Sequence, residues 1–215
     1  MVNVEKYSAI KKQLASTNTT LVAVSKIKPA ADIQSMYNLG QRDFGENYVQ
    51  ELVEKQAVLP KDINWHFIGH LQSNKVKYIA PFVHLIQSVD SEKLLKEIDK
   101  QAAKNDRKIN VLLQVHIAEE QTKFGFNEAE LMALNVRAYD NVNIVGLMGM
   151  ATFTDDKQKV KREFEHLKQL YNNFEKEKTI TLNTLSMGMS DDYELAINCG
   201  SNMIRIGSLL FGRRS

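Results

Sequence analysis

Residues 21–47 read LVAVSKIKPAADIQSMYNLGQRDFGEN, and this stretch contains one complete strand–helix–strand unit. It begins with a short apolar run at 21–26, which predicts a strand. From 29 to 39, the residues Ile33, Met36 and Tyr37 fall on one face of a helix, and Gly40 provides a natural stop. A second short run then predicts a strand at 42–47.

The same alternation continues along the chain and predicts eight strands in all. The later strands are expected at 64–70, 84–89, 110–118, 142–152, 181–189 and 202–211. Helices are expected at 4–14, 29–39, 48–58, 73–79, 91–103, 127–138, 157–176 and 191–198. Strict alternation of strand and helix means a parallel sheet. Eight units closing on themselves form a (β/α)₈ TIM barrel, and an open doubly wound sheet is the competing topology.

Composition indicates one ordinary globular domain. No linker or low-complexity tract divides residues 1–215, and the formal net charge is only +2, so no global field favours nucleic acid or membrane. The chain has no signal-peptide pattern and no apolar run long enough for a membrane span. Cys199 is the single cysteine, which excludes an internal disulfide and fits a reducing compartment. We therefore expect a cytoplasmic protein.

Chemistry in a barrel of this kind lies at the carboxyl ends of the strands, where Lys26 follows the first strand. A lysine there is either a solvated strand terminus or a nucleophilic amine. In a barrel mouth near Arg205 the pKa of the amine would fall, which favours a Schiff base with an aldehyde. Arg205 itself either points outward or faces an acceptor such as a heteroaromatic ring nitrogen. Asn47 either closes its strand or hydrogen-bonds a phenolate oxygen.

The last two strands end in segments suited to an anion. Gly188 permits a tight turn, and Ser190 is a candidate N-cap for a helix starting at Asp191. Gly207 and Ser208 offer further N–H groups and a hydroxyl. Together these segments predict a phosphate cradle of the helix N-terminus and nest type, with two ordinary capped loops as the alternative.

Other familiar sites are missing from the sequence. The five histidines are scattered, no Cys/His spacing resembles a zinc site, and there is neither a Walker A loop nor a Gly-x-Gly-x-x-Gly motif. Cys199 has no neighbouring acid or base and is interpreted as a buried small hydrophobic residue.

Several longer motifs together resemble the pyridoxal phosphate homeostasis protein family. They are VAVSK at 22–26, FGENY at 44–48, WHFIGHLQSNK at 65–75, TKFG at 122–125, GLMGM at 146–150, LSMGMSDD at 185–192 and RIGSLLFG at 205–212. The family is similar to the barrel domain of alanine racemase, a fold-type III pyridoxal phosphate protein, without its second domain.

The resemblance implies pyridoxal 5'-phosphate as cofactor, with roles for particular residues. Lys26 would carry the cofactor as a Schiff base, and Asn47 would lie beside its ring. Arg205 would face the pyridine nitrogen. The phosphate would be held by Ser186, Met187, Gly207 and Ser208, with Ser208 standing where many members have threonine.

The implied function is cofactor homeostasis: the protein would buffer pyridoxal phosphate or deliver it to apo-enzymes. An arginine beside the ring nitrogen leaves that nitrogen unprotonated, so the ring is a poorer electron sink. Racemases of this fold work with the same arrangement, but they bring a tyrosine base from the second domain and a partner subunit. Because the family lacks that domain, the resemblance implies a monomeric, non-catalytic carrier. A weak racemase remains an alternative, and a sugar-phosphate aldolase or isomerase is a third hypothesis independent of the resemblance.

A basic rim is a further hypothesis. Five cations could attract a dianionic cofactor to the mouth, although solvated surface charge is the plainer interpretation of each. They are Lys28, Lys75, Lys123, Arg213 and Arg214.

Overall fold

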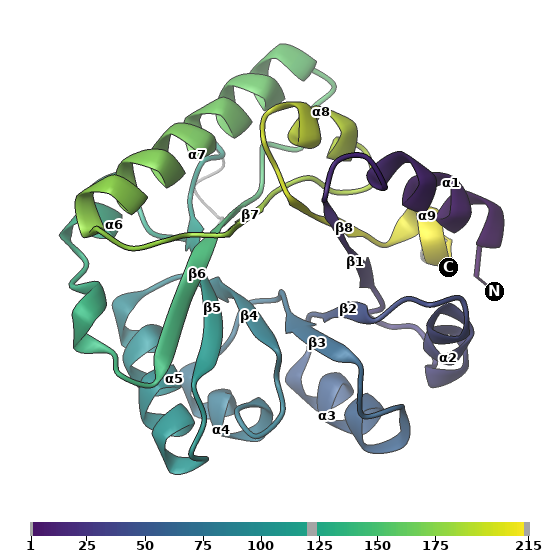
Figure 1. The fold of residues 1–215 in the computed structure, drawn as a ribbon, viewed down its shortest axis with the longest axis horizontal. Helices are drawn as coiled ribbons and strands as arrows, with labels where there is room; N and C mark the ends of the chain where they lie inside the picture. Colours follow the sequence, from purple (N-terminus) through teal and green to yellow (C-terminus); the bar gives the residue numbers. More distant parts are fainter. Residues whose placement is uncertain (1, 120–123, 213–215) are drawn as a thin grey trace.

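The computed structural model describes residues 2–119 and 124–212, which form a closed barrel of eight parallel strands (Figure 1). Each strand pairs with the next along the chain, and the last pairs with the first. The closed barrel confirms the predicted (β/α)₈ architecture and excludes the open sheet. The strands are β1 Thr20–Val24, β2 Asp43–Glu46, β3 Asn64–Phe67, β4 Leu85–Val89, β5 Ile109–Val115, β6 Val142–Gly149, β7 Thr184–Ser186 and β8 Met203–Ile206.

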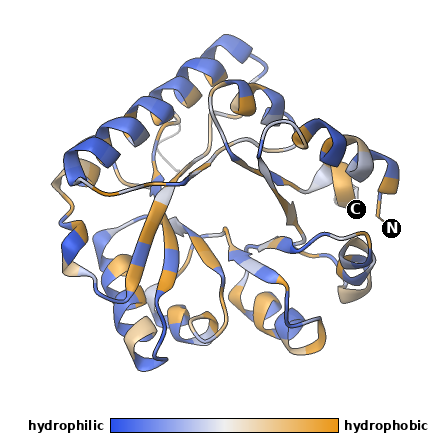
Figure 2. Cartoon of the chain, in the orientation of Figure 1, coloured by the Kyte–Doolittle hydropathy of each residue, from blue (hydrophilic) through white to orange (hydrophobic). Residues whose placement is uncertain are grey.

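Helices surround the barrel, and the long α7 is hydrophilic over most of its outer surface (Figure 2). A 3-10 turn, Ser73–Lys75, precedes α4. The helices are α1 Val4–Leu14, α2 Ala30–Asn38, α3 Val49–Val58, α4 Val76–Ile79, α5 Glu92–Lys104, α6 Glu128–Ala133, α7 Lys157–Lys178, α8 Tyr193–Asn198 and α9 Ser208–Phe211. None of the helices within the described ranges is long and apolar enough to cross a membrane.

The hydrophobic core has two parts. The larger part lies between the strands and the helices, where side chains such as Phe44, Phe164 and Leu95 are fully buried. A second, smaller cluster consists of Val22, Leu85, Leu112, Met148 and Met203. Burial on both faces explains why the strands read as continuous apolar runs in the sequence.

Several predicted elements differ in extent from the structure: the strand expected at 181–189, for example, covers only Thr184–Ser186. Two further differences have a visible cause. The strand expected at 202–211 ends at Ile206, because the carbonyl oxygen of Gly207 accepts hydrogen bonds from the N–H groups of Leu210 and Phe211 and starts α9. The helix expected at 127–138 breaks at Leu134, whose backbone is extended, and a 3-10 turn Val136–Ala138 follows it. Apolar periodicity continued across both breaks and concealed them.

Candidate functional site at the barrel mouth

Four of the predicted site residues meet at the carboxyl ends of neighbouring strands. β1 lies between β8 and β2, so the segments that follow these three strands leave the barrel at the same edge. These segments carry Lys26, Asn47 and the pair Gly207 and Ser208. Lys26 and Asn47 are half-buried, whereas Ser208 is exposed. We call this edge the mouth.

Arg205 lies beneath the mouth and is buried, which settles the choice left open by the sequence: it does not point outward. Its guanidinium donates to Ser186 Oγ at 2.6 Å and to the carbonyl oxygen of Gly149 at 3.1 Å. Burial lowers the pKa of Arg205 to about 10, and the Asp192 carboxylate opposes that shift. The guanidinium therefore stays charged at neutral pH.

A directional chain of hydrogen bonds runs from Arg205 through the barrel interior. The Ser186 hydroxyl that accepts from Arg205 donates to Gln87 Oε1 at 2.7 Å. Gln87 Nε2 then donates to His66 Nδ1 at 3.0 Å, and His66 Nε2 is 3.0 Å from Asp43 Oδ1. Ser186, Gln87 and His66 each accept a hydrogen bond on one side and donate one on the other, and the carboxylate of Asp43 can only accept. The chain therefore assigns the Nε2–H tautomer to His66. We call these five residues the relay.

Ser186 and Met187, the other two residues expected at the phosphate, lie beneath the surface of the barrel. Both residues are fully buried. The Ser186 hydroxyl is used in the relay, and the Met187 N–H donates to the carbonyl oxygen of Met203. The phosphate role expected for the two residues stays a prediction.

The loop beyond them approaches the segment that follows β8. Gly207 N–H donates to Ser190 Oγ at 3.4 Å, a long hydrogen bond. Ser190 is therefore not the N-cap expected from the sequence, since α8 starts at Tyr193 and Asp192 occupies the cap position. Both α8 and α9 are short, so individual N–H groups rather than a helix dipole would hold an anion.

Gly188 makes this loop possible. Its φ of +97° is favourable only for glycine, and a β-carbon there would lie 2.6 Å from the Cβ of Ala196. The turn brings Met189 N–H within 2.5 Å of Asp192 Oδ1. The loop is thereby fixed at both ends, with Ser190 between them.

A charged cluster lies where α3 packs against β2, next to the turn that carries Lys26. Lys55 Nζ of α3 lies 2.7 Å from Glu46 Oε1 and 2.5 Å from Glu51 Oε1. Ser25 Oγ donates to the same Glu46 oxygen at 2.6 Å. Burial raises the pKa of Glu46 to about 7, and the Lys55 ammonium opposes the shift. The sequence analysis missed this cluster, because Glu51 and Lys55 look like an ordinary exposed pair one helical turn apart.

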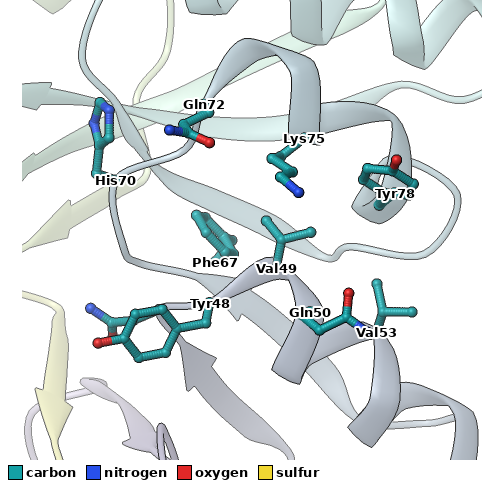
Figure 3. Close-up of a pocket in the computed structure, with 10 residues that line it drawn as sticks. Tyr48, Val49, Gln50, Val53, Phe67, His70, Gln72, Lys75 and Tyr78 are labelled. Atoms are coloured by element: carbon teal, nitrogen blue, oxygen red, sulfur yellow. The ribbon is translucent and has the colours of Figure 1, made fainter.

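A hollow of about 500 Å³ adjoins the mouth between the segments that follow β2 and β3 (Figure 3). Asn47 belongs to its wall, and the Asn47 Oδ1 atom is buried without a hydrogen-bond partner. A β-carbon at Gly69 would lie 2.3 Å from the Asn47 carbonyl oxygen, so the glycine allows the two segments to approach this closely. The Lys75 side chain extends into the hollow, between Val49 and Tyr78.

Of the five rim cations, two can be placed. Lys28 Nζ donates to the carbonyl oxygen of Phe211 at 2.8 Å and so joins the β1 loop to α9. Lys75 is exposed and lies 5.7 Å from the ring centre of Tyr78. Lys123, Arg213 and Arg214 lie outside the described residues. Within those residues, no three His, Cys, Asp or Glu side chains form a potential metal site. Cys199 is only half-buried, and burial raises the pKa of its thiol.

Comparison with known proteins identifies the family of the chain. Residues 4–215 match the family model described as alanine racemase, N-terminal domain. The chain is 41% identical to the pyridoxal phosphate homeostasis protein of Aquifex aeolicus, over 90% of this chain and 86% of that one. It is 37% identical to the protein of that name from Schizosaccharomyces pombe, over 96% and 89% of the two chains. The chain belongs to the pyridoxal phosphate homeostasis protein family.

Solved structures support the family assignment. PipY of Synechococcus elongatus, crystallised with and without pyridoxal phosphate, is 36% identical and covers 97% of this chain. Its TM-scores are 0.92 without and 0.89 with the cofactor, and 99% of PipY is matched. Alanine racemase of Bartonella henselae has a TM-score of 0.72 at 16% identity and is matched over 59% of its length, which shows a shared barrel fold.

Proposed function

We propose that this homeostasis-family protein binds pyridoxal 5'-phosphate at the barrel mouth and serves to buffer it or pass it to other proteins. The observation that carries the proposal is the convergence of Lys26, Asn47, Arg205 and Gly207 on one end of the barrel. When bound, the cofactor supplies an aldehyde with which a lysine amine condenses to a Schiff base. Lys26 is the proposed anchor.

The residues present fit this cofactor. The Asn47 Oδ1 atom is buried and has no hydrogen-bond partner. A phenolic oxygen of the cofactor beside this amide would supply the missing partner, with the oxygen and nitrogen of the amide oriented accordingly. The N–H groups of Gly207 and Ser208 and the Ser190 hydroxyl suit a phosphate. Arg205 brings a buried positive charge beneath the mouth, which would suit a dianionic ligand. Ser190 is a further proposed phosphate contact, in addition to the buried Ser186 and Met187.

We further propose that the protein does not use the cofactor for catalysis. The guanidinium of Arg205 keeps its proton, so it cannot protonate a ring nitrogen and strengthen the ring as an electron sink. The matched relatives are named for homeostasis rather than for a reaction. A racemase-type activity is the second candidate, favoured by the barrel shared with alanine racemase. Steady, Lys26-dependent deuterium incorporation at Cα of an L-amino acid would support that candidate.

Visible absorbance tests the proposed function. The wild-type protein, incubated with pyridoxal 5'-phosphate and freed of excess, should be yellow, and Lys26→Ala should be colourless. Lys93→Ala, which removes an exposed lysine from the outer helix α5, is the matched control and should remain yellow. A colourless wild type would refute the proposal and favour a sugar-phosphate barrel.

A further inference from the structure

The turn that carries Lys26 is strained at the next residue. Ile27 has a φ of +63°, a left-handed conformation that β-branched residues adopt only when their surroundings impose it. The Ile27 side chain is 60% exposed, so burial of its apolar surface does not hold the turn. Other contacts must therefore hold the backbone in this conformation.

Those contacts come from α3. Glu51 Oε1 accepts a hydrogen bond from the Ile27 N–H at 2.6 Å, and Lys55 Nζ donates to the Ser25 carbonyl oxygen at 2.8 Å. The backbone on both sides of Lys26 is thus bound to two side chains one helical turn apart. Lys28 N–H adds a third restraint by donating to the same Ser25 oxygen at 3.0 Å.

The two α3 side chains are themselves fixed. Lys55 has three N–H donors, and they are matched by three acceptors: the carbonyl oxygen of Ser25 and the carboxylates of Glu46 and Glu51. The Lys55 side chain is only 7% exposed, and that of Glu46 is fully buried. Burying charged groups costs free energy unless each charge is paired and hydrogen-bonded. A buried ion pair of this kind is best explained by the local conformation that it specifies.

We propose that Glu51 and Lys55 are positioning residues for Lys26: they hold the strained turn so that the lysine amine is presented to an aldehyde in the mouth. This inference rests on the proposed role of Lys26. The two residues act through the backbone of Ser25 and Ile27, and neither supplies the reacting atom. A misplacement of the amine by about 1 Å would be enough to slow covalent attachment about a hundredfold.

The test measures how fast pyridoxal 5'-phosphate and pyridoxal become attached to Lys26, trapped by borohydride and located by peptide mapping. Glu51→Ala and Lys55→Met should each slow attachment about tenfold or more. Both aldehydes should be affected equally, because the defect concerns the amine and not the phosphate cradle. Lys55→Arg, which keeps the donors, should recover most of the rate. Glu54→Ala, which removes an exposed carboxylate from the same helix, is the control and should not change it.

Thermal unfolding followed by circular dichroism separates positioning from loss of fold. Rates are compared at a temperature where every variant is folded, and the half-exposed Glu51 provides a variant if Lys55→Met does not fold. If folded Glu51→Ala and Lys55→Met both attach the aldehydes at the wild-type rate, the inference is overturned and the proposed function is not. So would a defect seen with pyridoxal 5'-phosphate but not with pyridoxal. A wild type without label on Lys26 would overturn the proposed function and the inference with it.

Discussion

Two polar networks lie beneath the mouth, and they are of opposite kinds. The cluster beside the Lys26 turn consists of the charged residues Glu46, Glu51 and Lys55, of which Glu51 and Lys55 hydrogen-bond to the backbone of the strained turn. The relay below Arg205 passes mainly through neutral side chains, in one fixed direction across the barrel interior. The charged cluster is suited to orienting the Lys26 amine, and the relay is suited to fixing the position of the Arg205 guanidinium.

The backbone differs between the two sides as well. Ile27 and Gly188 both have positive φ, but only Gly188 is a residue type that favours it. On the Lys26 side, side-chain contacts hold the backbone in an unfavourable conformation. On the cradle side, Gly188 itself favours the backbone conformation of the turn. A substitution that adds a β-carbon at Gly188 and one that removes the side chain at Ile27 should therefore change the free energy of unfolding by unequal amounts.

The largest effect is expected at Gly188. Gly188→Ala adds a β-carbon that would lie 2.6 Å from the Cβ of Ala196, in a backbone conformation unfavourable to alanine. We expect the free energy of unfolding to fall by about 3 kcal/mol. Ile27→Gly should change it by less than about 1 kcal/mol, since relief of strain offsets the added chain entropy. Chemical denaturation measures both, and equal losses would contradict the contrast.

The next effect is a pH dependence specific to the charged cluster. The pKa of Glu46 is raised to about 7 in the folded protein from 4.5, so the folded state binds the extra proton between these pH values. Its stability should therefore fall as pH rises from about 4.5 to about 7, by at most about 3 kcal/mol. Glu46→Gln cannot titrate and should flatten this part of the stability profile. An unchanged slope in the variant would assign the dependence to other groups.

A smaller effect is expected in the cradle. Ser190→Ala and Ser208→Ala should each weaken binding of pyridoxal 5'-phosphate about fivefold, since each removes one hydroxyl partner worth about 1 kcal/mol. Binding of pyridoxal, which has no phosphate, should not change. Equilibrium dialysis with both compounds makes the comparison. Equal losses for the two would show that these hydroxyls do not contact the phosphate.

The smallest effect concerns the rim. Lys75→Ala should slow loading of pyridoxal 5'-phosphate about twofold at low salt, and less at high salt, because an exposed charge is screened. Stopped-flow absorbance at two salt concentrations measures it. A loading rate and salt dependence equal to those of the wild type would identify Lys75 as ordinary surface charge.

The sequence predicted the barrel well, because alternation and strand-end chemistry are local patterns. Lys26, Asn47 and Gly207 could be placed at one end by counting strands alone. The errors arose where only spatial neighbours decide. Nothing in the sequence indicates that the Ser186 hydroxyl meets Gln87, which is 99 residues away.

Ser190 and Lys55 show the same limit. Ser190 was interpreted as a helix cap because it precedes two acidic residues, yet its hydroxyl meets Gly207 N–H from the next strand end. Lys55 follows Glu51 by four residues, a spacing typical of a solvated pair. Its burial against Glu46 depends on how α3 packs on β2, and helical periodicity alone does not provide that information.

The central claim is that Lys26 is the single covalent anchor, and peptide mapping after borohydride reduction tests it most directly. The protein is loaded with pyridoxal 5'-phosphate, reduced, digested and analysed by mass spectrometry. We predict one modified peptide, containing Lys26, with Lys28 and Lys55 unmodified. Label distributed over exposed lysines, or its absence from Lys26, would contradict the claim.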